Sequence, residues 1–433
     1  MDILTSNDQV GVYPPSYYAD SAQPLAEFPS AKGALKCDVC VVGAGFTGLS
    51  AALHLAQRGY DVVLLDAHRV GFGASGRNGG QVGMGQRLEQ EELEQMLGMD
   101  HARALWDLAC ESVQKVRDLV RDNDMDCGFA DGIIHADHRA RFVRDSHAHA
   151  EKMRRDYNYD LIRPLDREEI RHLVGSPAYH GGSLDMGGGH LHPLRYAFGL
   201  ARLARAAGVR IFERSKVLSV EETSPAILRT SEAEITAAHV VMACNGYLGR
   251  LQKQVAARVM PINNFIVATE PLSEKAADAL IRNNHAVADS KFVINYFRLS
   301  QDRRLLFGGS ESYGYRFPAD IAALVRKPML KIYPQLAETH IDYAWGGTLG
   351  ITLNRMPHFA RITGNILSAS GYSGHGVAMA TLGGRLAAEA IAGQAERFDL
   401  MASVPTPRFP GGVALRWPLL VLAMTWFSLR DKI

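Results

Sequence analysis

Glycines at positions 43, 45 and 48 give the spacing GxGxxG within the segment GAGFTG. An apolar run at 39–42 precedes them, and apolar residues recur at helical spacing over 49–56. This strand–glycine–helix order is the context that makes the motif specific. The first glycine permits a tight turn, the second lets the backbone approach a pyrophosphate, and the third lets the helix pack on the strand. The N–H groups at the helix start would bind the phosphate anion.

Asp66 ends the next apolar run, 61–65, shortly after the helix. A carboxylate at this place can accept hydrogen bonds from an adenosine ribose, and its charge would repel a 2′-phosphate. The whole segment 37–66 therefore predicts a dinucleotide-binding βαβ unit that disfavours NADP. A glycine-rich turn without a ligand is the alternative, and the strand and helix on either side argue against it.

A second GxGxxG spacing, at 71–76, lacks that context. No apolar-periodic helix follows it, and Arg77, Asn78 and further glycines come next. We interpret this stretch as a loop that lets the backbone approach a bulky cofactor.

Three segments together carry a family resemblance: CDVCVVGAGFTGLSAALHLAQRGYDVVLLDA, GFGASGRNGGQ and NILSASGYSGHGV. They resemble the D-amino-acid oxidase, sarcosine oxidase and glycine oxidase superfamily of flavoproteins. GFGASGRNGGQ, GGGHLHPL, LNRMPHFAR, AERFD and SLRDK are similar to the branch that serves bacterial putrescine degradation. The likeness extends from about Tyr17 onward. It implies oxidation of an amine by FAD, with oxygen or a quinone as the electron acceptor.

The resemblance also implies the architecture. We expect an α/β fold in which a Rossmann-like FAD-binding domain is interleaved with a second, mainly antiparallel β-sheet substrate domain, as in the glutathione-reductase type of FAD fold. The expected division is an N-terminal arm over 1–36, FAD-binding segments 37–110, 190–255 and 345–433, and substrate-domain segments 111–189 and 256–344.

Contacts to FAD are implied at several loops. Ser75, Arg77 and Asn78 would wrap the pyrophosphate and flavin side, Val217 would contact adenine, and the loop 371–377 would reach the flavin ring. A helix beginning at the end of that loop would direct its positive end at the flavin. The expected FAD-binding set comprises Gly43, Gly45, Phe46, Thr47, Gly48, Asp66, Ala67, Ala74, Ser75, Arg77, Asn78, Gly79, Gly80, Gln81, Val217, Ala243, Cys244, Asn245, Gly246, Gly371, Tyr372, Ser373, Gly374, His375, Gly376 and Val377.

Two departures from the sarcosine oxidase pattern bear on the chemistry. Ala378 stands where those enzymes have a lysine that holds the substrate carboxylate, and 350–354 contains no cysteine to attach the flavin. We therefore expect non-covalent FAD. We also expect a substrate without a carboxylate on the reacting carbon, such as a polyamine or its glutamyl conjugate.

The reaction needs a neutral amine, because only that form has the lone pair that drives hydride departure. A lysine-like amine has a pKa near ~10.4, so about one molecule in a thousand is neutral near pH 7.4. The site must offset about 4 kcal/mol, and an aromatic pocket would do so by desolvating the cation. Tyr296, Phe297, Trp345 and Tyr372 are the candidates, and for each the alternative is a core aromatic.

Two further residues are candidates for catalysis or substrate binding. His375 could act as a general base, although a packing or hydrogen-bonding role is favoured in a loop built from backbone donors. Arg298 could bind a remote carboxylate, and a surface strand arginine is the alternative.

Composition excludes several classes of protein. The chain of 433 residues has 47% hydrophobic and 21% charged residues and a net charge of +1, which gives no field for nucleic acid or an anionic membrane. Its start lacks a signal-peptide pattern, and its five cysteines do not suggest a disulfide framework or a metal site, so we expect a cytoplasmic protein. Cys37 and Cys40 form a CxxC on a predicted strand, where they should face opposite sides.

The apolar segment 417–429 is too short to span a bilayer. A helix packed on the protein is favoured, and a peripheral membrane contact is the alternative. Such a contact would suit a membrane-associated D-amino-acid dehydrogenase, which is the main rival function. A nicotinamide dehydrogenase and a non-catalytic flavin-binding subunit are the others, and the former gives no reason for GYSGHG.

Overall fold

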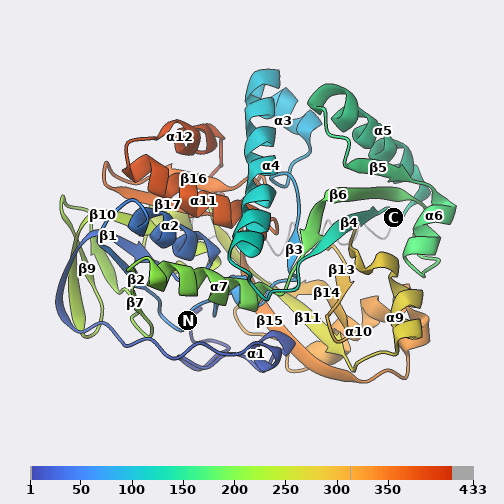
Figure 1. Cartoon of the computed structure of the whole chain (residues 1–433), viewed down its shortest axis with the longest axis horizontal. Coiled ribbons are helices and arrows are strands. Elements are labelled where there is room, and N and C mark those ends of the chain that lie inside the picture. Colours follow the sequence, from blue (N-terminus) through green and yellow to red (C-terminus); the bar gives the residue numbers. More distant parts are fainter. Residues whose placement is uncertain (1, 313, 412–433) are drawn as a thin grey trace.

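The computed structural model describes residues 2–312 and 314–411. Two large sheets lie side by side, with the long helix α4 (Met99–Asp122) standing between their helical layers (Figure 1). The predicted α/β fold is confirmed. The predicted βαβ unit is confirmed as well: β1 (Gly33–Val42), α2 (Phe46–Ala56) and β2 (Val62–Leu65), with β1 and β2 parallel.

The first sheet has a parallel centre, and its strands are buried on both faces, which explains their continuous apolar runs. Only β16 and β17 pair antiparallel along the main path. The strands follow in the spatial order β16 (His358–Arg361), β17 (Ile366–Ser370), β10 (Ala233–Met242), β1, β2 and β7 (Arg210–Phe212). The hairpin of β8 (Ser219–Glu221) and β9 (Ala226–Arg229) joins the edge of β10.

Three helices form one contiguous core with this sheet: α2, α7 (Pro193–Ala206) and α11 (Gly376–Ile391). α2 and α11 approach closely because small residues line their contact. A Cβ on Gly384 of α11 would lie 2.2 Å from the carbonyl oxygen of Thr47 on α2. This contact fixes the start of α2 against the middle of α11.

The second sheet is mainly antiparallel, as predicted; β12 and β4 form its parallel pair. Its strands follow in the order β15 (Ile341–Ile351), β11 (Met260–Thr269), β14 (Leu305–Ser312), β13 (Tyr296–Leu299), β12 (Ala286–Asp289), β4 (Ala130–Ala136), β6 (Gly182–His190) and β3 (Gln81–Val82). β5 (Ile162–Leu165) pairs with β6 outside this path. The expected hairpin is confirmed as β13 and β14.

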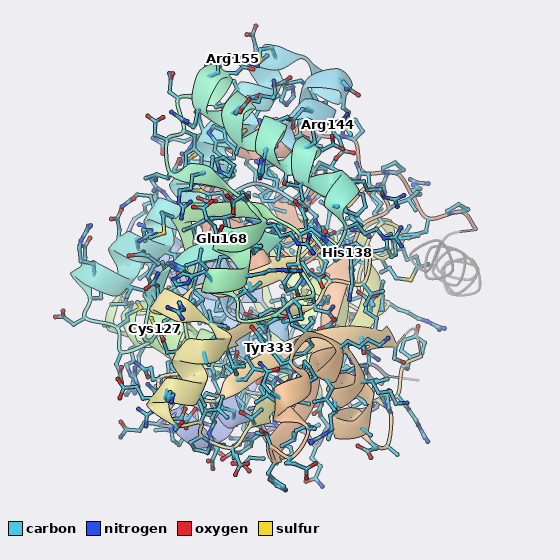
Figure 2. All side chains as sticks on the ribbon, turned by 90° about the vertical axis from the view of Figure 1, so that its right-hand side faces the viewer. Cys127, His138, Arg144, Arg155, Glu168 and Tyr333 are labelled. Atoms are coloured by element: carbon cyan, nitrogen blue, oxygen red, sulfur yellow. The ribbon has the colours of Figure 1, made fainter. Side chains whose placement is uncertain are left out.

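The second sheet has its own hydrophobic core, to which α10 (Ile321–Ile332) contributes Val325 and Met329. The outer helix α5 (Ala140–Tyr157) carries Arg144 and Arg155, which point away from the body of the protein (Figure 2). The remaining helices are α3 (Gln90–Leu97), α6 (Arg167–Leu173), α9 (Glu274–Leu280), α8 (Lys253–Ala256) and α12 (Glu396–Ser403).

The expected domain boundaries all fall inside regular elements. They lie in β1, α4, β6, α8 and β15, in the order 36/37, 110/111, 189/190, 255/256 and 344/345. The expected irregular arm also differs, because it contains α1 (Tyr17–Ser21) and the first residues of β1. Tyr17 and Tyr18 of α1 are buried, so this arm is part of the packed structure.

The CxxC prediction was wrong about side-chain direction. The N–H groups of Asp38 and Val39 both donate to the carbonyl oxygen of Asp61, at 3.0 and 3.1 Å, so the regular two-residue alternation of β1 is interrupted at this point. Cys37 and Cys40 accordingly lie in the same hydrophobic cluster. Both are free thiols.

The predicted C-terminal apolar helix, 417–429, lies outside the described residues. Among the residues that the structure describes, none of the helices is long and apolar enough to cross a membrane.

Candidate active site

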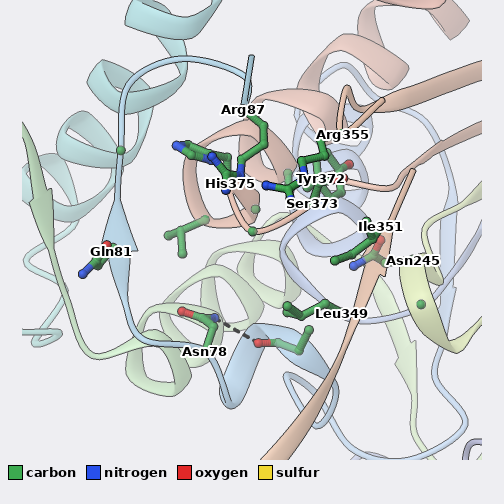
Figure 3. A pocket seen from close by; sticks show the side chains of 18 of the residues that line it. Asn78, Gln81, Arg87, Asn245, Leu349, Ile351, Arg355, Tyr372, Ser373 and His375 are labelled. Atoms are coloured by element: carbon green, nitrogen blue, oxygen red, sulfur yellow. Dashed lines mark hydrogen bonds between the residues drawn. The ribbon is translucent and has the colours of Figure 1, made fainter. Parts of the chain in front are cut away.

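One large cavity is lined by residues from both sheets and has a volume of about 2260 Å³. Pockets for a single small molecule are usually about 300–1,000 Å³. This cavity therefore has room for an extended dinucleotide and a second ligand. Figure 3 shows its inner part, where side chains from the β3–α3 loop, β15 and the loop before α11 converge.

The turn between β1 and α2 lies at one end of the cavity and depends on its glycines. Gly43 has φ +105°, and a Cβ there would lie 2.8 Å from the carbonyl oxygen of Ala243. A Cβ on Gly48 would lie 1.8 Å from the carbonyl oxygen of Gly43. Gly45 caps α2 without a side-chain hydrogen bond, and the N–H of Phe46 donates to the Ser75 hydroxyl at 3.0 Å. The start of this helix lines the cavity, where its remaining N–H groups could bind an anion.

The Asp66 carboxylate lies next to that turn and lines the cavity. It accepts hydrogen bonds from the N–H groups of Ala44, at 2.6 Å, and His68, at 2.7 Å. Burial raises the pKa of Asp66 to about 6, although both hydrogen bonds favour the ionised form. A carboxylate oxygen has more than one acceptor position, so Asp66 can still accept hydroxyl groups of a ligand.

The loop before α11 closes the other end. Asn245 accepts a hydrogen bond from the N–H of Gly371 at 2.9 Å, and Ser373 accepts one from Thr352 at 3.2 Å. His375 caps α11 without a side-chain hydrogen bond, which leaves a second helix N-terminus open to the cavity. The Nδ1 atom of His375 is buried and has no hydrogen-bond partner among the described residues. Burial lowers the pKa of this imidazole to about 3, so it is neutral at physiological pH and poorly matched to a general base.

These features fit FAD. The glycine turn and the start of α2 would hold its pyrophosphate, Asp66 its ribose, and the loop before α11 its flavin ring. The orphaned Nδ1 of His375 is a polar atom that a bound ligand would satisfy. Gly48, Gly80 and Gly371 are absent from the described lining, and the rest of the expected FAD-binding set lines the cavity. A side chain on any of these three glycines would collide with its neighbours.

Arg77 and Asn78 line the cavity, but their side chains bind other parts of the protein. Arg77 donates to the carbonyl oxygen of Phe72 at 2.7 Å and pairs with Asp8 of the arm at 3.2 Å. Asn78 donates to the carbonyl oxygens of Ala74 and Ser75 at 2.9 and 3.1 Å. These contacts hold the shape of the loop, and the expected contact of the two residues with the cofactor stays a prediction.

The two predicted tyrosines both line the cavity. Tyr296 donates its hydroxyl to Asn264, and a Cβ on Gly79 would lie 2.6 Å from its ring. The hydroxyls of Tyr372 and Thr47 are 2.7 Å apart. Burial raises the pKa of both tyrosines, so both stay neutral and contribute a desolvated aromatic surface.

Three other predicted positions lie elsewhere. Phe297 and Trp345 are core residues and do not appear among the described lining residues, so the aromatic wall predicted there was wrong. Ala378 is also buried in the core.

Arg298 is nearly fully buried, and its guanidinium is taken up by the protein. It donates to the carbonyl oxygens of Gly79, at 2.7 Å, and Leu191, at 2.9 Å, and to the hydroxyl of Tyr18 at 3.1 Å. It is outside the described cavity lining. The substrate-binding role expected for Arg298 is therefore not retained.

Sequence reasoning missed the wall contributed by the second sheet and by two loops. Ile133, Ile266 and Asn264 line the cavity from the sheet, and Arg87 and Arg355 line it from the loops. Arg355 lies within LNRMPHFAR, a segment that carries the family likeness. That likeness was the only signal for this residue, and it gave Arg355 no role.

The fold and the cavity define a class of flavoprotein, and comparison with known proteins agrees. The chain belongs to the DAO family of FAD dependent oxidoreductases, whose model matches residues 38–390.

Individual relatives cover nearly the whole chain. It is 42% identical to gamma-glutamylputrescine oxidoreductase of Escherichia coli (strain K12), over 96% of this chain and 98% of that protein. It is also 42% identical to the probable oxidoreductase OrdL of Rhizobium meliloti (strain 1021), over 96% and 97% of the two chains. The crystal structure of glycine oxidase from Geobacillus kaustophilus superposes with a TM-score of 0.70 at 20% identity, over 83% of this chain and 95% of that one.

Non-covalent attachment of the cofactor stays a prediction, because 350–354 contains no cysteine. Acid precipitation of the purified protein is expected to release all of the yellow colour into the supernatant. Colour that stays with the washed precipitate would contradict it, and absorbance of the two fractions measures the split.

Proposed function

We propose that this protein oxidises the primary amine of gamma-glutamylputrescine or a closely related polyamine conjugate. The amine loses two electrons and two hydrogens to become an imine, which water converts to an aldehyde and ammonia. Bound FAD supplies the two-electron acceptor for this chemistry. The main support for this proposal is the 42% identity, over nearly the whole of both chains, to a relative that is named for this substrate.

The chemistry of the cavity supports an amine substrate. The apolar wall of Ile133 and Ile266, with the Tyr296 ring, would desolvate an ammonium group and so favour its neutral form. His375 is uncharged, so it would not hold the amine as a cation.

The position of the substrate carboxylate is the second support. Ala378, which replaces a carboxylate-binding lysine, is buried in the core. A carboxylate on the reacting carbon would need a fixed cation, because a buried unpaired charge is costly. The acceptor of the electrons from the reduced enzyme is oxygen or a quinone.

The experiment that tests this function is anaerobic reduction of the bound flavin. Gamma-glutamylputrescine is expected to bleach its visible absorbance rapidly, and putrescine more slowly. Sarcosine and D-alanine are the comparison amines because each has a carboxylate on the reacting carbon. Bleaching by those two alone would overturn the proposal.

A further inference from the structure

Two arginines from loops far apart in the sequence meet at the cavity. Arg87 lies between β3 and α3, and Arg355 lies between β15 and β16. Figure 3 shows both on the same side of the cavity, next to His375. The charge of Arg87 lowers the pKa of His375, and the charge of Arg355 lowers the pKa of Arg87. Arg87 therefore lies close enough to both residues for their charges to interact.

Neither guanidinium has an ion-pair partner or a hydrogen-bond acceptor within the described ranges 2–312 and 314–411. Arg355 lies over the ring of Phe292, with its guanidinium carbon 4.8 Å from the ring centroid. Of the other arginines that line the cavity, Arg77 pairs with Asp8 at 3.2 Å and Arg155 with Asp156 at 2.7 Å. Arg250 also lines it and, like Arg87 and Arg355, has no ion pair among the described residues. The pair of Arg87 and Arg355 is thus an unneutralised positive site.

The electrostatics of the pair are unfavourable without an anion. Burial lowers the pKa of Arg87 to about 10, and the charge of Arg355 acts in the same direction. Glu89, Glu92 and Glu311 act in the opposite direction, but none of these three is within ion-pair distance of Arg87. A bound carboxylate would remove the repulsion between the two cations.

The backbone at both positions is also unusual. Arg87 has φ +103° and Arg355 has φ +63°, a region that side-chain-bearing residues seldom adopt. Backbone strain of this kind is concentrated at functional sites. Both strained positions direct a guanidinium to one place.

We propose that Arg87 and Arg355 together bind the substrate carboxylate that is remote from the reacting amine. In a gamma-glutamyl amine this group is the α-carboxylate of the glutamyl moiety. Planar guanidinium groups match a carboxylate with two parallel hydrogen bonds. The inference rests on the proposed function and deepens it, because the pair selects acylated, carboxylate-bearing amines over free polyamines, whose charges are all positive.

Calorimetric binding to the FAD-loaded protein tests the pair without turnover. The probe is N-butyl-γ-glutamine, which has the glutamyl group but no terminal amine. N-butyl-4-aminobutanamide is the matched probe, since it lacks only the carboxylate. The wild-type protein is expected to bind the first probe at least about 10-fold more tightly than the second.

Arg87→Gln and Arg355→Gln are each expected to weaken binding of N-butyl-γ-glutamine by about 10- to 100-fold. Binding of the matched probe should change little. Arg87→Lys keeps the positive charge but loses the planar pair of donors that matches a carboxylate, so an intermediate loss of affinity for N-butyl-γ-glutamine is expected. Arg155→Gln, at an exposed and paired arginine of the cavity mouth, is the control and should bind both probes as the wild type does. Thermal unfolding and flavin content check that each variant is folded.

Equal affinity of the wild type for both probes, or equal losses for both probes in the glutamine variants, would overturn the assignment. Retention of wild-type affinity for N-butyl-γ-glutamine by both variants would do the same. Failure of the proposed function has a different signature: tight, arginine-dependent binding of the probe without reduction of the flavin by gamma-glutamylputrescine.

Discussion

Gly48→Ala is expected to yield a protein that retains little FAD and unfolds at a clearly lower temperature. The new Cβ would lie 1.8 Å from the backbone oxygen of Gly43, so α2 must move away from the turn. Because the obstruction is backbone, no side chain can give way. The cost is about 3 kcal/mol or more, and the displaced helix start no longer presents its N–H groups to the pyrophosphate. Visible absorbance per protein and thermal denaturation measure the two effects.

Gly59→Ala is the matched control, since Gly59 follows the same helix. Its φ is +86°, and a Cβ there meets nothing within 4 Å. The substitution costs about 1 kcal/mol of backbone strain and leaves the phosphate end unchanged. A Gly48→Ala protein with full FAD content and wild-type stability would contradict the role given to the turn.

Asp66→Ala is expected to weaken FAD binding by about 10- to 100-fold, because hydroxyls of the ribose lose a charged acceptor. The N–H groups of Ala44 and His68 lose the same acceptor, which loosens the turn around them. Asp61→Ala is the control: that exposed carboxylate begins the same strand region and pairs with Arg210 at 2.8 Å. Equilibrium titration of the apoprotein with FAD gives both dissociation constants.

The same carboxylate predicts how FAD binding depends on pH. The pKa of Asp66 is raised to about 6, above its ordinary value, so ionisation lowers the stability of the apoprotein as the pH rises through that range. Hydroxyl donors of bound FAD favour the ionised form and lower this pKa. FAD binding should therefore weaken as the pH falls below about 6, by up to about tenfold per pH unit. Asp66→Asn should remove this dependence; an unchanged pH profile in that variant would show that another group is responsible.

The phosphate end of the site could be predicted because its determinants are local. Gly43, Gly45 and Gly48 lie within one turn, and their function follows from the strand before them and the helix after them. Asp66 needs one more strand, whose parallel pairing with β1 follows from the same βαβ unit.

The substrate end could not be predicted in the same way. Arg298 points away from the cavity because the buried Tyr18 of the N-terminal arm accepts from it, a contact between distant segments. Arg87 and Arg355 come together only because the loops that follow β3 and β15, the strands at opposite ends of the second sheet, meet at the cavity. Cys37 and Cys40 lie in one hydrophobic cluster because the alternation of β1 is interrupted at Asp38, which a strict two-residue pattern could not predict.

The central claim is that this FAD-dependent protein oxidises an amine substrate in which the carboxylate is remote from the reacting carbon. The most direct measurement is the rate of flavin bleaching in an anaerobic stopped-flow instrument, with each amine at the same sub-saturating concentration. Gamma-glutamylputrescine should reduce the flavin faster than putrescine, and sarcosine and D-alanine should reduce it slowest or not at all. Rapid reduction by sarcosine or D-alanine, with no reduction by putrescine or its glutamyl conjugate, would contradict the account.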